Sequence, residues 1–419
     1  MSNIVPVPTT PQAHGVHKVD LGLYYDEFVG ERFHKYLVAT SSEGVYLRKD
    51  MMDSNWTELW LPFESSDVYL GNKTICFRTA RNKLILNSAF HVNESLRAVL
   101  KESKISNPEF VLIDEFKLVD YCYEKFDIPD TVMRSYEYNK ITCDSLHLYI
   151  EMSNGLLICL SSSQNAPGVK VNTDFMSHNE RIMFIEGASQ SEKVMIVTTS
   201  NKIYGYHFQT LKLLNRDEIT SSITSLVVSP VCAFVTTQDN KLYVIGDDSN
   251  GSTGGVQQAR EKFLPTLIQF KEKIVQVKCG YIHSLILLDS GEVYATGYND
   301  LKQCCISDPP HIFTKTELVL REKDHPRSLQ CSSRGSVFLT DTEAIFVGEV
   351  VHKFQTYSNY QLRVPLGAEF NDVRGGGWQY VVFKSCAHPS KMLNFFWSSL
   401  KQRANDKEQK FHDILFEYL

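Results

Sequence analysis

The feature that most constrains the fold is a hairpin pattern that recurs along the chain. Residues 226–246, LVVSPVCAFVTTQDNKLYVIG, superimpose on residues 277–297, VKCGYIHSLILLDSGEVYATG, at an offset of 51 positions. Each copy has an apolar run, a two-residue turn, a second apolar run with a tyrosine, and a closing glycine. A third copy, 335–348, follows after a similar interval with one residue deleted. Asn and Gly tolerate positive φ, so a tight turn between two apolar runs predicts a β-hairpin.

Weaker copies of the hairpin occur upstream. The expected turn residues along the chain are Gly44, Asn82, Gly155, Asn201, Asn240 and Gly291. Short strands repeated at an interval of about 40 to 50 residues are typical of a β-propeller, in which each unit forms one four-stranded blade. We therefore expect an all-β fold, a β-propeller of about seven blades of four antiparallel strands, with eight blades left open.

The two ends of the chain differ from the repeats. Residues 1–17 are rich in proline and predict a flexible N-terminal tail, 18–388 predict the propeller, and 389–419 predict a C-terminal helical extension with an apolar stripe. A final half-unit, 373–385, lacks its outer hairpin partner, whereas 18–30 is a strand-like run with no inner partner. Pairing these two segments would remove two exposed sheet edges, so we expect the ring to close between them.

The interval between the turns at Asn82 and Gly155 is longer than the others. It contains 91–103, where apolar residues at helical spacing follow Asn93, a candidate N-cap. Residues 108–126 then return to a strand-like composition. We expect either one enlarged blade here or a degenerate extra unit.

Composition and charge argue against several classes of protein. Lys and Arg number 43 against 49 Asp and Glu, and this balance does not suit a surface that mainly neutralises nucleic-acid phosphates. No stretch approaches the ~20 apolar residues of a membrane helix. The N-terminus lacks the features of a signal peptide, and the 10 cysteines include no CxxC pair. We expect an intracellular protein, cytoplasmic or nuclear, that binds neither nucleic acid nor membrane and has reduced thiols.

One unit carries a recognisable motif. Within 263–305, a proline precedes a short strand, and Gly-x-x-His-Ser, a glycine turn, Val-Tyr-x-x-Gly and Asn-x-x-x-Gln follow in order. The matching residues are Pro265, Gly280, His283, Ser284, Gly291, Val293, Tyr294, Gly297, Asn299 and Gln303. In this motif the chain resembles the regulator of chromosome condensation family. It resembles a degenerate member, because the preceding unit has Ser229 and Cys232 where the family has Gly and His.

The resemblance implies one of two functions. Propellers of this family serve as guanine-nucleotide exchange factors for small GTPases or as rigid platforms for protein interaction. We expect a non-catalytic scaffold or adaptor, because the repeats are eroded and the basic arm expected of chromatin-bound members is missing. The alternative is an exchange factor whose partner is a small GTPase. We interpret His283 as a framework histidine of the repeat, and we expect no catalytic residue, metal or cofactor.

Partner specificity is expected where the chain is least repeat-like, since loops vary on a constant propeller framework. The long segment 89–137 and the loop DDSNGSTGG at 247–255 meet this criterion. A run of aromatic residues in the C-terminal extension is a further candidate, because aromatic side chains are enriched at the centres of interfaces. The partner-binding residues predicted from the loop and the extension are Asp247, Asp248, Asn250, Phe395, Phe396 and Trp397.

Overall fold

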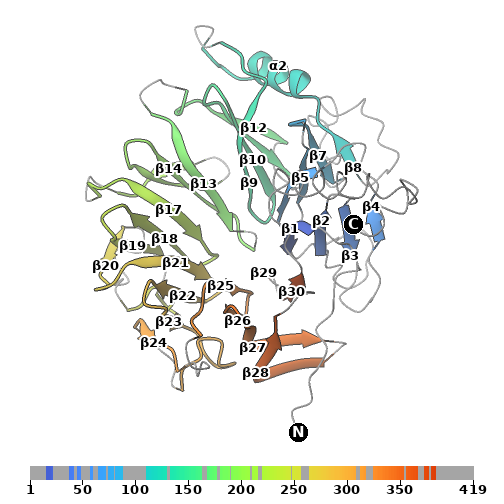
Figure 1. Ribbon diagram of the computed structural model, residues 1–419. Helices are drawn as coiled ribbons and strands as arrows, with labels where there is room; N and C mark the ends of the chain where they lie inside the picture. The colour runs from blue at the N-terminus through green and yellow to red at the C-terminus, as the bar shows by residue number, and fades with distance from the viewer. Residues whose placement is uncertain are drawn as a thin grey trace, which may run out of the picture.

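The computed structural model arranges the chain as a ring of antiparallel sheets (Figure 1). It describes residues 16–21, 37–41, 45–48, 57–59, 65–71, 74–79, 81–87, 110–129, 133–162, 168–176, 180–188, 190–207, 210–215, 219–246, 248–255, 264–307, 312–317, 324–352, 355–366, 372–376 and 379–383. Over these ranges, seven sheets have four strands and an eighth has two. The expected all-β propeller is confirmed.

Consecutive strands of the chain pair in order within each sheet. The first three sheets are formed by β1 (Val16–Leu21), β2 (Leu37–Ser41), β3 (Val45–Arg48) and β4 (Thr57–Leu59); β5 (Ser65–Leu70), β6 (Ile75–Thr79), β7 (Leu84–Asn87) and β8 (Phe110–Leu112); and β9 (Tyr138–Cys143), β10 (His147–Met152), β11 (Leu157–Ser161) and β12 (Val169–Asn172). The first strands of successive sheets neighbour one another and surround the centre of the ring (Figure 1).

The remaining sheets repeat this order. They are formed by β13 (Ile182–Ala188), β14 (Lys193–Thr198), β15 (Ile203–His207) and β16 (Thr210–Leu213); β17 (Ile223–Val228), β18 (Cys232–Thr237), β19 (Leu242–Gly246) and β20 (Thr266–Ile268); β21 (Ile274–Cys279), β22 (His283–Leu288), β23 (Val293–Gly297) and β24 (Thr314–Lys315); β25 (Ser328–Cys331), β26 (Gly335–Leu339), β27 (Glu343–His352) and β28 (Gln355–Pro365); and β29 (Asp372–Gly376) with β30 (Gln379–Phe383).

The tight turns between second and third strands have the expected backbone. The residues with φ between +58° and +88° at these turns are Asn82, Gly155, Asn201, Asn240 and Gly291. Gly44 lies outside the described residues. In the shortened third copy, residues 340–342 join β26 to β27 without a residue of positive φ. The single deletion therefore changes the type of turn but keeps the hairpin.

The core lies between neighbouring sheets. Second strands such as β10 and β22 are buried at every position, because each sheet packs on both of its faces. One apolar cluster joins Phe234 and Val244 of one sheet to Val277 and Ile286 of the next. The sequence accordingly shows continuous apolar runs at the second strands, since no face of these strands is left for solvent.

The ring does not close as the sequence predicts. The half-unit at 373–385 forms β29 and β30, which pair only with each other among the described strands. The predicted pairing with 18–30 is wrong, because β1 pairs with β2 and begins a four-stranded sheet of its own. β29 lies beside β25 on one side and β1 on the other. A two-stranded sheet thus fills the gap between the first and last four-stranded sheets (Figure 1).

The connection between β8 and β9 contains a helix, α2 (Glu115–Lys125). The strand-like composition of 108–126 is matched by β8, but the prediction is wrong after it, where the chain forms this helix. Asp114 caps the helix by accepting hydrogen bonds from the backbone N–H groups of Phe116 and Lys117, each at 3.1 Å. Leu118 and Cys122, one turn apart, pack into the core beneath it. Apolar side chains at this spacing bury one face of a helix.

Some expectations fall on parts of the chain that the structure does not describe. The helix expected at 91–103 and the extension at 389–419 lie outside the described residues, as does nearly all of the tail expected at 1–17. β1 begins at Val16, just before the expected start of the propeller. No helix in the described ranges combines the length and apolar character needed to cross a membrane.

Asparagines at two hairpin tips bind one sheet to the next. The Asn240 amide donates to the carbonyl oxygen of Glu272 at 2.9 Å and accepts from Ile274 N at 2.8 Å. Asn201 bonds in the same way to Ser221 O and Ile223 N, both at 3.1 Å. Ile223 and Ile274 begin the first strands of the following sheets. Each asparagine therefore fixes where the next sheet starts.

We predict that Asn240→Ala lowers the free energy of unfolding by ~1–3 kcal/mol, because two hydrogen bonds are lost and alanine must adopt a positive φ. Asn240→Gly should lower it less, since glycine removes the hydrogen bonds but tolerates the turn. Urea denaturation of the purified chain measures both. Asn250→Ala, at an exposed loop position, is the control and should change stability by less than ~0.5 kcal/mol. If Asn240→Ala left the free energy of unfolding unchanged, the hydrogen bonds of Asn240 would not hold the two sheets together.

Candidate functional site

In two successive sheets, the first residue of the second strand faces the next sheet. His283 begins β22, is buried, and has Nε2 2.9 Å from the Ser336 hydroxyl of β26. Cys232 begins β18, is buried, and has its sulfur 4.0 Å from the Ser284 hydroxyl of β22. These contacts support the interpretation of His283 as a framework histidine, with a side chain of the next sheet as its partner.

The loop that follows β19 is closed by its own hydrogen bonds. Thr253 N donates to the Asp248 carboxylate at 3.0 Å, and Gly254 N donates to Gly251 O at 3.0 Å. Gly251 and Gly254 have φ of +70° and +77°, a backbone conformation that glycine adopts without strain. The loop is bound to the next sheet as well, because Thr296 of β23 donates to Gly251 O at 2.7 Å.

The loop that follows β23 has the same design with different residues. Cys304 N donates to the Asn299 side-chain oxygen at 2.9 Å, as Thr253 does to its aspartate. Lys302 and Cys305 have φ of +62° and +53°. At the offset of 51 positions between the two units, they correspond to Gly251 and Gly254 of the preceding loop. The loop conformation therefore survives here although its sequence signature does not.

These loops show where the predicted partner-binding residues lie. The Asp248 carboxylate is engaged within its loop, whereas Asn250 is exposed. Asp247 lies outside the described residues, as do the extension residues Phe395, Phe396 and Trp397. Their role in partner binding stays a prediction.

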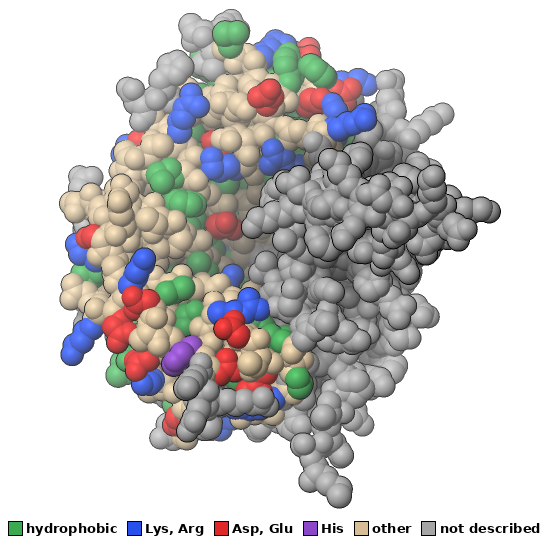
Figure 2. Space-filling model, in the orientation of Figure 1, with side chains coloured by type: hydrophobic (Ala, Val, Ile, Leu, Met, Phe, Trp, Pro, Cys, Tyr) green, Lys and Arg blue, Asp and Glu red, His purple; other side chains and the backbone are tan. Residues whose placement is uncertain are grey.

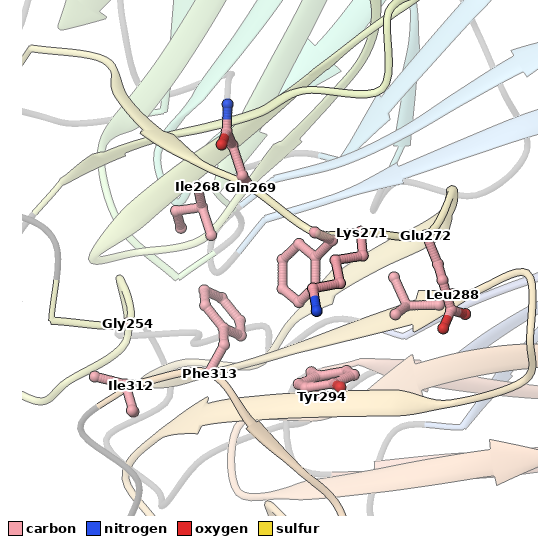
Figure 3. A pocket seen from close by; sticks show the side chains of 10 residues that line it. Gly254, Ile268, Gln269, Lys271, Glu272, Leu288, Tyr294, Ile312 and Phe313 are labelled. Carbon is pink, nitrogen blue, oxygen red and sulfur yellow. The ribbon is translucent and has the colours of Figure 1, made fainter.

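A groove of about 460 Å³ opens beside the loop at 248–255, between the β17–β20 and β21–β24 sheets (Figure 3). Its walls come from β20, from the connection that leads into β21, from β22 and β23, and from the connection before β24. The lining residues are Gly254, Ile268, Gln269, Phe270, Lys271, Glu272, Leu288, Tyr294, Ile312 and Phe313. The groove therefore lies where the two neighbouring sheets meet.

Aromatic rings form the floor of the groove. Phe270 meets Tyr294 at a centroid distance of 5.4 Å and Phe313 at 5.8 Å, with interplanar angles of 71° and 73°. Phe313 also meets the buried Phe234 at 6.1 Å. Edge-to-face pairs of this kind are attractive beyond the area that they bury. A Cβ atom at Gly254 would lie 2.6 Å from the Phe313 ring, so glycine is needed for the ring to pack there.

Two charged side chains line the groove, Lys271 and Glu272, and a third, Glu292, lies beside Tyr294. Glu292 forms an ion pair with Lys315 and accepts a hydrogen bond from the Tyr294 hydroxyl at 3.3 Å. The hydrogen bond from Lys315 lowers the pKa of Glu292. Lys271 extends from the opposite wall over the groove toward Tyr294 (Figure 3). No ion pair of Lys271 is found among the described residues. Ile312 is 64 % exposed at the edge.

The arrangement suits binding more than chemistry. The groove offers aromatic and aliphatic surface with an ammonium group over it, and such surfaces are typical of interface centres. Within the described ranges, no group of three or more His, Cys, Asp or Glu side chains is placed to hold a metal ion. Figure 2 shows basic and acidic side chains interspersed over the described part of one face, so that neither sign dominates it.

Sequence reasoning missed the groove because its lining is scattered over 254–313. Tyr294 was recognised only as a residue of the repeat motif. Phe270 and Phe313 lie in connections between strands, and neither belongs to a pattern that repeats along the sequence. No sequence signal marks this site, because residues 254–313 are no richer in aromatic residues than the rest of the chain.

Comparison with known proteins agrees with the resemblance seen in the sequence. Residues 239–287 and 274–303 match the family described as "Regulator of chromosome condensation (RCC1) repeat". The resemblance to this family is thereby confirmed. The human X-linked retinitis pigmentosa GTPase regulator is 32 % identical over 117 residues, which is 27 % of this chain. The chain spans 11 % of the length of that relative.

Solved structures are similar in fold. Human WBSCR16 superimposes with a TM-score of 0.56 at 13 % identity, over 79 % of this chain and 89 % of that one. The structure of yeast RCC1 (Prp20) with Kap60 gives a TM-score of 0.48 at 11 % identity, over 79 % and 82 % of the two chains. At 13 % identity, the likeness to WBSCR16 concerns the fold alone.

The buried framework histidine makes stability depend on pH. Burial lowers the pKa of His283 to about 4 from its ordinary value of 6.5. Between these values the unfolded chain binds a proton that the folded chain does not. The contribution of His283 to the free energy of unfolding is therefore complete above pH ~6.5 and falls by ~3 kcal/mol as the pH decreases to ~4, at 1.36 kcal/mol per pKa unit.

We predict that His283→Gln removes this part of the acid sensitivity. Urea denaturation of wild type and variant between pH 7.5 and pH 4.5 measures it. The stability advantage of the wild type should shrink steadily as the pH falls, because glutamine does not titrate. A difference between the two proteins that is the same at every pH would show that His283 is not held neutral.

Proposed function

We propose that this propeller, which carries repeats of the regulator of chromosome condensation family, is a non-catalytic scaffold that binds a protein partner in the groove between the β17–β20 and β21–β24 sheets. The repeats and their relative support a role in protein interaction or GTPase regulation. The observation that carries the proposal is the aromatic floor of the groove with the exposed Ile312 at its edge.

The floor is suited to receive a side chain without rearranging. Phe270, Tyr294 and Phe313 hold one another in edge-to-face contacts, and Tyr294 is also bonded to Glu292. Because these rings are already fixed, a ligand does not lose free energy in ordering them. An aliphatic or aromatic anchor buried in such a site contributes about 1.5–3 kcal/mol.

The charges define the kind of segment that fits. The Lys271 ammonium lies over the rings of the groove, whereas the Glu272 carboxylate lies beside Leu288, and Glu292 is already paired with Lys315. A partner segment with an apolar anchor next to an acidic residue would place its carboxylate at Lys271 and its anchor against the rings. Charge complementarity of this kind sets orientation and specificity. The exposed Asn250, in the loop that also supplies Gly254, is available for further polar contacts.

The alternative function is guanine-nucleotide exchange on a small GTPase. It is favoured by the similarity to a protein named as a GTPase regulator, over 27 % of this chain. An exchange factor would act by inserting loops into the GTPase and would need no covalent chemistry of its own. For either function we place the protein inside the cell, in the cytoplasm or nucleus.

Substitutions in the groove test the proposal. We predict that Ile312→Asp and Lys271→Glu each abolish capture of the partner by the immobilised full chain, as read by quantitative mass spectrometry of the bound proteins. Ile312→Asp places a charge against the apolar anchor, and Lys271→Glu repels the acidic residue. Both positions are exposed, so the free energy of unfolding should change by less than ~0.5 kcal/mol.

Leu213→Asp is the matched control. Leu213 is 48 % exposed on β16, an outer strand of a different sheet, and its variant should keep the partner. Equal loss of capture with Leu213→Asp would refute the groove as the binding site. If the captured protein is a small GTPase and the chain accelerates its GDP release, the exchange-factor alternative replaces the scaffold.

A further inference from the structure

The chain beyond the last described strand contains a short segment whose chemistry matches the groove. β30 ends at Phe383, and the residues that follow lie outside the described part. Among them, residues 413–417, DILFE, carry three apolar side chains between two acidic ones. An apolar side chain beside a carboxylate is what the rings and the Lys271 ammonium of the groove suit. A segment of this same chain therefore has the chemistry needed to bind there.

Charge distinguishes this segment from the rest of the C-terminal extension. Residues 389–412 include the aromatic run Phe395, Phe396 and Trp397, but their charged residues are mainly basic. A basic segment would bring charge of like sign to Lys271. Residues 413–417 contain two carboxylates and no Lys or Arg. Complementary charge therefore selects 413–417 from the extension.

The two charged side chains that line the groove lie at separate places (Figure 3). The Lys271 ammonium lies over the aromatic rings, whereas the Glu272 carboxylate lies beside Leu288. An acidic segment is attracted by Lys271 and repelled by Glu272. Its carboxylate therefore belongs at the end of the groove where the rings are, next to its apolar anchor.

The apolar surface of the groove has room for this run of side chains. Its volume of about 460 Å³ lies within the range of ~300–1,000 Å³ that is typical of sites for drug-sized ligands. Ile312, 64 % exposed at the edge, is available to be covered by an occupant. The Phe270, Tyr294 and Phe313 rings already meet one another edge to face, and a further aromatic ring can add to this arrangement. Phe416 is therefore the anchor that suits the floor best.

The chain between β30 and the segment is long enough for the contact to form within one molecule. Two sheets, β21–β24 and β25–β28, lie between the groove and the sheet of β29 and β30. About 30 residues join Phe383 to Asp413. Such a length spans up to ~100 Å when extended and ~45 Å as a helix, whereas a chain of this size has a radius of gyration of only ~22 Å.

We propose that residues 413–417 occupy the groove of their own chain, with Phe416 against the aromatic floor and a flanking carboxylate at Lys271. An external partner then binds in the groove only by displacing this segment. The inference rests on the proposed function, because it concerns the regulation of the same site.

Carbodiimide coupling of the full chain, followed by tryptic mass spectrometry, tests the contact. The reagent forms an amide between an ammonium and a carboxylate that touch, so it reports on Lys271 with Asp413 or Glu417. We expect a link, in the monomer, between peptide 263–273 and the peptide that begins at Phe411. Lys125, exposed on α2, is the control and should not be linked to that peptide. Absence of the link to Lys271, or a link found only in a cross-linked dimer, would overturn the proposal.

Variants on both sides of the contact distinguish docking from simple attraction of charges. Phe416→Asp keeps both carboxylates but removes the anchor, and Ile312→Asp places a charge at the edge of the groove. Each should lower the yield of the link about ten-fold, the factor expected for the loss of one buried apolar side chain. Ser399→Asp adds a charge to the extension outside 413–417 and should keep the link. An undiminished yield in Phe416→Asp would overturn the proposal, because attraction of charges alone would then explain the link.

Capture of the partner by the immobilised full chain separates this contact from partner binding itself. Because the segment and the partner share the groove, Phe416→Asp should raise capture about ten-fold. Capture that depends on Ile312, in a chain that forms no link to Lys271, would refute the contact and leave the partner site standing. A link to Lys271 together with capture that Ile312→Asp does not change would refute the partner site and leave the contact standing.

Discussion

The contact between each sheet and the next is the constraint on which this ring depends. Second strands such as β10 and β22 are buried at every position, so polar groups at their start need partners close by. His283 meets the Ser336 hydroxyl, and Ser284 donates to Ser252 O at 3.1 Å. The tip asparagines add a second set of bonds at the outer turns. From β13 to β28, neighbouring sheets are therefore held together by hydrogen bonds as well as by apolar packing.

The same constraint explains why the sequence predicts some parts of the fold and misses others. Hairpins were predictable because the turns at Asn201, Asn240 and Gly291 require a positive φ and flank continuous apolar runs. Helix α2 was not predicted because its sequence contains aromatic and β-branched residues, which also suit a strand. Ring closure was predicted wrongly because the composition of 18–30 indicates a strand but does not show which strand it pairs with. In the structure, β1 pairs with β2.

The candidate site was harder to predict than the fold. Its rings come from β23 and from two connections, and only packing brings Phe270 against Phe313. Motif matching also underestimated the regularity of the loops, since Lys302 and Cys305 keep the left-handed backbone without glycine. Conversely, Asp248 drew attention as a polar loop residue, yet it holds the loop together as Asn299 does in the next sheet. Side-chain type alone does not separate these roles.

The two-stranded sheet of β29 and β30 has a consequence for how the chain folds. In the described part, every strand pairs with a neighbour close in sequence, and no strand from one end of the chain completes a sheet at the other. Sheets built from local contacts form quickly, because little chain entropy is lost in bringing their strands together. The units can therefore assemble in order as the ribosome releases them, from β1 onward. Ring closure is then the docking of β29 against β1 and β25, which brings together sheets from distant parts of the chain after each has formed.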